Sequence, residues 1–205
     1  MRLSRIAAVT AAAAAMIVPF GVPAQAATPV WNIVNPNANG SFTGTGAVSA
    51  IKNPSGSLVI SCPAVALTGV MPSGSNTSGY LGRLVSSNPP PCSDQAGGSW
   101  QLFIPSSMVG SSLHATGYDA AAGRTSFNGM TGNIFVVGPN CGFEIDTFSG
   151  TYTNATSTLA TTSGHVRVGA TSDGKPTCVG LLNDLDTITF ASSFTLSPAI
   201  TVTRS

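Results

Sequence analysis

Charged residues are scarce in this chain of 205 residues: Asp, Glu, Lys and Arg together make up 7% of it, whereas they make up about a quarter of a typical globular domain. Nucleic acids and anionic membrane surfaces are bound by clustered Lys and Arg, and the sequence contains no such cluster. We therefore expect neither as a partner. Hydration of the surface must depend instead on Ser, Thr, Asn and Gly.

Long apolar runs are missing beyond the N-terminus. Arg2 and Arg5 precede an apolar run at residues 6–20, and residues 24–26, Ala-Gln-Ala, supply the small residues that a signal peptidase requires. The run is shorter than the roughly 20 residues that span a bilayer. Residues 1–26 are therefore predicted to be a cleaved signal peptide, with no membrane span afterwards. We expect a secreted, extracellular protein with a single β domain at residues 27–205.

Closely spaced cysteines, which zinc sites usually require, do not occur. The four cysteines are far apart, at Cys62, Cys92, Cys141 and Cys178. In an exported chain such cysteines indicate two disulfides, with three possible connectivities. We favour Cys62–Cys92 and Cys141–Cys178, because each pair encloses an excursion rich in Gly, Ser and Pro. Each closed loop would stabilise the fold by about 3–4 kcal/mol.

Helical periodicity is almost absent after Trp31, and period-2 alternation takes its place. The clearest case is at residues 186–196, where Ile188, Phe190, Phe194 and Leu196 share one parity and polar residues share the other. Further strands are predicted at residues 40–50, 57–61, 64–70, 80–86, 99–104, 111–118, 125–137, 142–153 and 164–171, with a break near Gly129 left open. A short run follows Pro198 at residues 199–203. Turn signals rich in Gly, Pro and Asn separate them, so we predict an all-β, antiparallel fold of about ten strands.

Glycines inside the predicted strands bear on the choice between a barrel-like fold and its alternative, a β-sandwich. Several of them, including Gly129 and Gly150, lie on the apolar parity, and such glycines often mark bulges or sharp bends of a barrel wall. The apolar parity also flips between Ile145 and Phe148, which predicts a β-bulge there. These features favour a barrel-like fold, while glycines at sheet edges would suit the sandwich.

An ordered set of short motifs carries a resemblance. The motifs are SWQL at 99–102, LHATGY at 113–118, GPNC at 138–141, GTYTN at 150–154, CVGLLN at 178–183 and FTLSPA at 194–199. Together they resemble a group of small exported actinobacterial proteins that have no assigned activity. The resemblance covers most of residues 27–205. It implies export, two disulfides and an all-β fold, and it brings no catalytic residues.

Catalytic signatures are also lacking. His114 and His165 each lie opposite the parity of their apolar neighbours, and no G-x-S-x-G elbow places a Ser beside either of them. Glu144 and Asp146 lie two apart and share a strand face, so they could act as a glycosidase acid and base, although such carboxylates usually come from different strands. We favour surface histidines and solvated acids over either catalytic arrangement.

One loop has the composition of a cation site. Asn183, Asp184 and Asp186, with Asp173 nearby, offer the oxygen ligands that Ca²⁺ prefers. The glycine and the final glutamate of an EF-hand loop are missing, and a strand-end turn explains the same residues without a metal. We expect no cofactor.

Aromatic side chains offer two further ways to bind a ligand. Trp31, Trp100, Tyr80, Tyr118 and Tyr152 could stack on sugars if they shared an exposed face, although Trp100 alternates with Leu102 and is expected in the core. Tyr118 shares the parity of His114, so these two residues and His165 form the candidate ligand-binding set. A barrel lumen could instead accept a small apolar ligand.

Three functions follow from these patterns. The preferred one is an exported, non-catalytic β domain that acts outside the cell as a surface, matrix or ligand-binding protein. Its candidate partners are a small apolar or sugar ligand, or a component of the cell envelope. A small secreted hydrolase of extracellular polymer or lipid is the first alternative. The second is a self-associating surface protein, suggested by the low charge. The sequence leaves the oligomeric state open.

Overall fold

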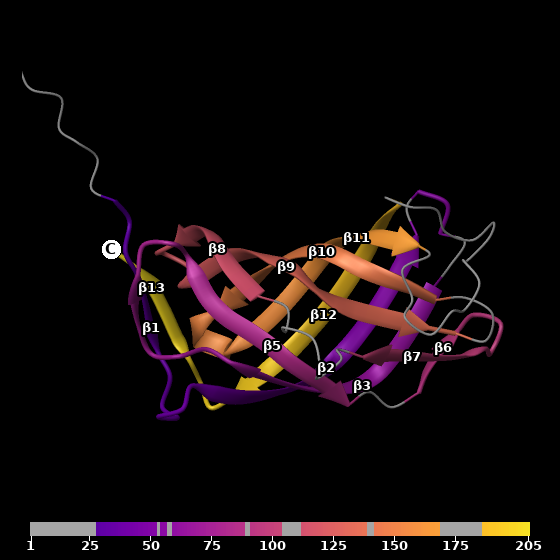
Figure 1. Cartoon of the computed structure of the whole chain (residues 1–205), viewed down its shortest axis with the longest axis horizontal. Helices are drawn as coiled ribbons and strands as arrows, with labels where there is room; N and C mark the ends of the chain where they lie inside the picture. Colours follow the sequence, from indigo (N-terminus) through magenta and orange to yellow (C-terminus); the bar gives the residue numbers. More distant parts are fainter. Residues whose placement is uncertain are drawn as a thin grey trace, which may run out of the picture.

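The computed structural model consists almost entirely of antiparallel strands, which confirms the all-β prediction (Figure 1). It describes residues 28–52, 54–56, 59–88, 91–103, 112–138, 142–168 and 186–205. The predicted signal peptide, Cys141, Cys178, Asn183 and Asp184 lie outside these ranges. The described residues include no helix with the length and apolarity of a membrane span.

The elements follow the sequence in this order: β1 (Trp31–Val34), β2 (Ser41–Lys52), β3 (Val59–Val70), β4 (Gly74–Asn76), β5 (Tyr80–Asn88), β6 (Cys92–Asp94), β7 (Ser99–Phe103), β8 (Ser112–Asp119), β9 (Arg124–Val137), β10 (Gly142–Thr153), the 3₁₀ turn η1 (Asn154–Thr156), β11 (Thr158–Val168), β12 (Thr187–Ser197) and β13 (Thr201–Arg204). The strongly alternating segment of the sequence is β12, whose burial alternates along its whole length.

Ten of the strands belong to one sheet that closes into a ring. Its pairing order is β10-β11-β12-β2-β3-β5-β8-β9, and β9 pairs with β10 to complete the circle. The hairpin β6–β7 makes a second connection between β3 and β9. Two pairs of strands therefore connect β3 to β9 and close the ring: β5 and β8 toward one end, and β6 and β7 toward the other. This closure is what the barrel-like prediction requires.

A separate three-stranded sheet, in the order β13-β1-β4, lies at the end of the molecule opposite the β6–β7 hairpin (Figure 1). Asn154 connects it to the ring, because the side-chain amide of Asn154 donates to the Val202 carbonyl and accepts from the Val202 N–H. The phenol of Tyr152 donates to the Ile200 carbonyl nearby. Burial raises the pKa of this phenol.

The inner face of the ring is packed with apolar side chains, and three phenylalanines there pair with glycines on neighbouring strands: Phe42 opposite Gly69, Phe148 opposite Gly129, and Phe127 opposite Gly150. At Gly129 a Cβ atom would lie 2.1 Å from the Phe148 ring. The glycines thus leave the space that the rings occupy, which is how aromatic residues compensate for glycine in a strand.

The predicted bulge is confirmed. The register of β10 shifts between Ile145 and Thr147 against both of its neighbours, β9 and β11. A second shift, between β2 and β3, coincides with Pro63. Because proline cannot donate a ladder hydrogen bond, a bulge is where a strand tolerates it. The segments predicted as separate strands at residues 57–61 and 64–70 therefore form one interrupted strand, β3.

The β6–β7 hairpin is held by a disulfide and by one carboxylate. The bond joins Cys62 on β3 to Cys92 on β6, which confirms one of the two predicted pairings; the other lies outside the described residues. Asp94 accepts hydrogen bonds from the indole Nε1–H of Trp100 (2.8 Å) and from the Gly98 backbone N–H (2.7 Å). These donors lower the pKa of Asp94, the Trp100 bond most strongly.

Candidate functional site

The interior of the ring is filled by its own side chains. A cavity of about 30 Å³ remains among them, lined mostly by Leu, Ile, Val and Phe side chains. Ligand pockets typically measure several hundred cubic ångströms, so the predicted lumen for an apolar ligand is not found in the described interior. The polar groups at this cavity satisfy each other: Thr161 bonds to the Phe190 carbonyl and to the Ser192 hydroxyl, each at 2.7 Å.

The outer face of β9, β10 and β11 has a groove of about 280 Å³, which we call the outer groove. It is lined by Asn128, Gly129, Thr147, Phe148, Ser149, Ser163, Gly164 and His165. One wall is the row of cross-strand partners Asn128, Ser149 and Ser163, and the other contains the partners Thr147 and His165. Since alternate residues on a strand lie about 7 Å apart, the groove is a trough of that width running across the strands.

The floor of the outer groove is formed where side chains point inward. Phe148 faces the interior, and its register partners on the two sides are Gly129 and Gly164. A Cβ atom at either glycine would also face the interior, against the Phe148 ring or against Ile145 and Phe190. The backbone of three neighbouring strands therefore forms the bottom of the trough. The bulge between Ile145 and Thr147, which the sequence predicts, lies beside this floor.

The wall that contains Ser149 continues beyond the groove. Asn128 pairs with His114 on β8, and His114 pairs with Tyr80 on β5. We call the five partners Tyr80, His114, Asn128, Ser149 and Ser163 the polar row. The rings of Tyr80 and His114 meet edge to face, with centroids 5.5 Å apart. With strands about 4.8 Å apart, the polar row is about 19 Å long.

The polar side chains in the outer groove are hydroxyl, carboxamide and imidazole groups. The Ser149 and Ser163 hydroxyls bond to each other at 2.7 Å, and each hydroxyl has one proton and two lone pairs. The pair therefore keeps one donor and further acceptor positions for a ligand. In the described structure, no hydrogen bond connects the exposed His165 to either serine.

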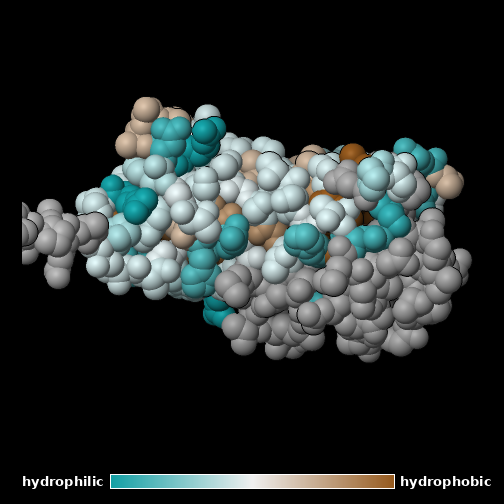
Figure 2. Space-filling view, turned by 90° about the horizontal axis from the view of Figure 1, so that it is seen from above, coloured by the Kyte–Doolittle hydropathy of each residue, from teal (hydrophilic) through white to brown (hydrophobic). Residues whose placement is uncertain are grey.

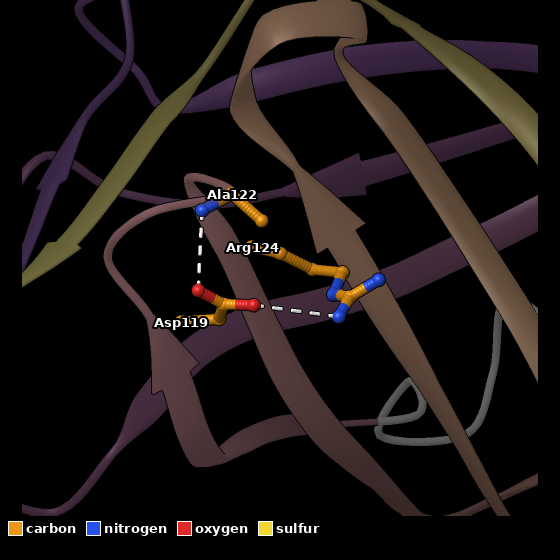
Figure 3. Close-up of polar contacts among 3 residues, drawn as sticks. All are labelled: Asp119, Ala122 and Arg124. Carbon is orange, nitrogen blue, oxygen red and sulfur yellow. Dashed lines mark hydrogen bonds and ion pairs between the residues drawn. The ribbon is translucent and has the colours of Figure 1, made fainter.

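The residues that line the outer groove include no Asp, Glu, Lys or Arg. Lys52 and Asp186 form an ion pair at 2.8 Å where β2 and β12 pair. At the β8–β9 turn, Asp119 accepts the Ala122 backbone N–H and lies 3.5 Å from the Arg124 guanidinium (Figure 3). Figure 2 shows one face of the molecule mostly in the pale colours of intermediate hydropathy, with separate hydrophilic residues on it.

The three residues predicted to bind a ligand lie in different parts of the structure. His165 lines the outer groove, and His114 lies on the polar row. Tyr118 does not share their face, because the register of β8 shifts between Ala115 and Gly117 and pairs Tyr118 with the buried Thr125. Tyr118 packs against the core and contacts the Trp31 ring edge to face at 6.4 Å. The prediction that Tyr118 faces outward together with His114 was wrong, because the bulge in β8 turns the Tyr118 side chain to the opposite face.

The predicted aromatic platform is not formed. Trp31, Trp100 and Tyr152 are all buried, so they cannot stack on an external sugar. The core position expected for Trp100 is confirmed. Glu144 is also buried, with 5% of its surface exposed, so its description as a solvated acid was wrong. The side chain of Asp146 lies outside the described residues.

Only one residue of the predicted cation site, Asp186, lies within the described residues. Asp186 is in the ion pair with Lys52, whereas Asn183 and Asp184 fall outside the described residues. Within the described ranges, no three His, Cys, Asp or Glu side chains come close enough together to hold a metal ion.

A larger groove of about 550 Å³ lies over β2 and β3. Its lining combines small hydroxyl residues such as Thr43 and Thr68 with Phe42, Val70, Val85 and Pro198. Its lining also lacks formal charge, but it contains no histidine. Two of its polar groups already bond to carbonyls of other lining residues: the Asn37 amide donates to Ser41 and the Thr43 hydroxyl donates to Ser197. We therefore regard the outer groove as the candidate site.

Comparisons with protein-family models, with curated proteins and with solved structures found no match. We therefore infer function from the geometry of this chain alone. Within that geometry, Asn128, Thr147, Ser149 and Ser163 were not singled out from the sequence. A strand prediction that began at Thr158 would have placed Ser163 and His165 on one face.

Proposed function

We propose that the protein is an exported, non-catalytic β domain that binds a ligand outside the cell through the outer groove. The observation that carries the proposal is the concentration of hydroxyl, carboxamide and imidazole groups in a trough whose floor is backbone. The filled interior supports it, because it leaves the outer surface as the place for a ligand. Export is part of the proposal; it rests on the predicted signal peptide and fits the Cys62–Cys92 disulfide.

Native mass spectrometry of the protein purified from its own culture medium tests this proposal. We expect a bound ligand, or a binding activity, that His165→Ala weakens without changing the thermal unfolding midpoint. Turnover of ester or glycoside substrates that His165→Ala abolishes would contradict a non-catalytic role.

A secreted hydrolase is the second candidate, because Ser149, Ser163 and His165 lie in one groove. A serine nucleophile needs a base in hydrogen-bonding reach and a group that orients the base. No such bond reaches His165 in the described chain. Labelling by a fluorophosphonate probe at Ser149 or Ser163 would favour this candidate over a binding domain.

Self-association is less well supported. A self-associating face usually includes a contiguous apolar patch, and Val34, with 61% exposure, is the one large apolar side chain that is exposed among the described residues. Sedimentation at high concentration distinguishes the cases, since a monomer counts against assembly.

A further inference from the structure

We propose that the outer groove recognises a neutral saccharide and that the polar row extends this site for a chain of several sugars. The proposal rests on the binding role argued above and specifies its ligand. It follows from three independent properties of the groove: the kind of hydrogen-bonding groups, the absence of charge from its lining, and its shape.

The hydrogen-bonding groups of the groove match those of a sugar. Hydroxyl, carboxamide and imidazole groups each offer both a donor and an acceptor, as sugar hydroxyls do. Asn128, Ser149, Ser163 and His165 present such groups around one trough. Serine and asparagine side chains are short, so a ligand that orders them loses little side-chain entropy.

The charge of the groove argues against other common ligands. A phosphate or carboxylate ligand is usually held by Arg or Lys, and a divalent cation by several carboxylates. The residues that line the groove include neither kind. An apolar ligand would leave the hydroxyl pair of Ser149 and Ser163 and the amide of Asn128 covered without new partners, which is unfavourable.

The shape of the groove suits an extended chain of rings. The trough is about 7 Å wide between its walls. Its floor is backbone at Gly129, Phe148 and Gly164, where side-chain positions face the interior, so no side chain there blocks a ring lying edge-on. The polar row continues from this trough to His114 and Tyr80, whose paired rings offer faces for stacking. The outer groove would hold one or two sugars, and the rest of the row would contact those that follow.

Isothermal titration calorimetry on the full mature chain tests the proposal. The probes are cellohexaose, maltohexaose and chitohexaose, with inorganic phosphate and laurate as ligands of other classes. The variants are Ser149→Ala, His165→Ala and their combination. Ser193→Ala, an exposed serine on β12 outside the groove, is the matched control. Circular dichroism and thermal unfolding confirm that each variant is folded.

We expect at least one hexasaccharide to bind, with its Kd raised at least tenfold in the double variant and less than twofold in Ser193→Ala. His114→Ala should weaken the hexasaccharide more than a disaccharide of the same linkage. Binding of none of the three saccharides would overturn the proposal. If phosphate or laurate bound instead and the groove variants weakened it, the ligand class would be wrong while the binding role remained. Hydrolysis of a saccharide would overturn the binding role itself.

Discussion

The two faces of the closed sheet have opposite character although they are built from the same strands. On β10, Phe148 points into the ring and lies against Gly129, while its neighbours Thr147 and Ser149 point outward into the outer groove. The inner face is packed around a cavity of about 30 Å³, and the outer groove measures about 280 Å³. Changes on the inner face should therefore affect stability, and changes on the outer face should affect binding.

The interior glycines act on the inner face. At Gly129 and Gly164 a side chain would point into the ring, so glycine makes room there for Phe148, Ile145 and Phe190. A position that looks weak as a strand residue thus serves the packing of the inner face. This difference between the faces can be tested by substitutions, taken below from the largest expected effect to the smallest.

Phe148→Ala should have the largest effect. Its ring is 4% exposed and meets the rings of Phe127 and Phe190, each at 6.4 Å. Removing a buried aromatic side chain costs about 3–5 kcal/mol of unfolding free energy. Urea denaturation of the variant and the parent measures this loss. A loss below about 1 kcal/mol would mean that the inner face is not closely packed.

Gly129→Ala and Gly117→Ala form a matched pair on the two faces. The Cβ at Gly129 would lie 2.1 Å from the Phe148 ring, whereas at Gly117 the nearest atom is 3.8 Å away on the outward-facing Ser126. Overpacking at Gly129 should cost about 1–3 kcal/mol, and Gly117→Ala should be close to neutral. The comparison of the two denaturation midpoints checks this, and equal effects would contradict the difference between the faces.

Thr161→Val tests the one polar pair described inside the ring. Valine keeps the shape but removes the hydroxyl that bonds to Ser192 and to the Phe190 carbonyl. The Ser192 hydroxyl and the Phe190 carbonyl lose this hydrogen-bond partner, so the free energy of unfolding should fall by about 1–3 kcal/mol. Adding Ser192→Ala should recover part of this loss in a double-mutant cycle. Purely additive losses would show that the two hydroxyls do not interact.

Asp94→Asn should have the smallest effect on stability, and this effect should depend on pH. The half-buried carboxylate of Asp94 accepts a hydrogen bond from the indole N–H of Trp100, whose ring is buried. The folded pKa is lowered from 3.8, so the carboxylate stabilises the fold above the unfolded pKa. This contribution is lost as the pH falls through the folded pKa. The unfolding midpoints of the parent and Asp94→Asn should therefore differ at neutral pH and converge in acid; a constant difference would contradict this origin.

Much of the fold could be predicted from local patterns. Alternation located the long strands, the parity flip located the bulge between Ile145 and Thr147, and the loop composition favoured the Cys62–Cys92 pairing. The short strands β1, β4 and β6 were missed, because three or four residues are too few to show a period. The first half of β11 was missed as well, since the buried Thr161 interrupts its apolar parity.

The candidate site was harder to predict because it depends on register between strands. His114, Asn128, Ser149 and Ser163 become neighbours only when β8, β9, β10 and β11 pair in one alignment. No local pattern in the sequence specifies that alignment. Tyr118 shows the same difficulty, since a single bulge in β8 moved it to the inner side.

The central claim is that ligand binds to the outer face and not inside the ring. The most direct test is a titration of the labelled mature chain with cellohexaose, maltohexaose and chitohexaose, in which backbone amide and side-chain methyl NMR shifts are followed together. We expect shifts at the amides of Asn128, Ser149 and His165, with unchanged methyl groups at Leu67 and Leu159 beside the interior cavity. Shifts confined to those interior methyl groups would contradict the account.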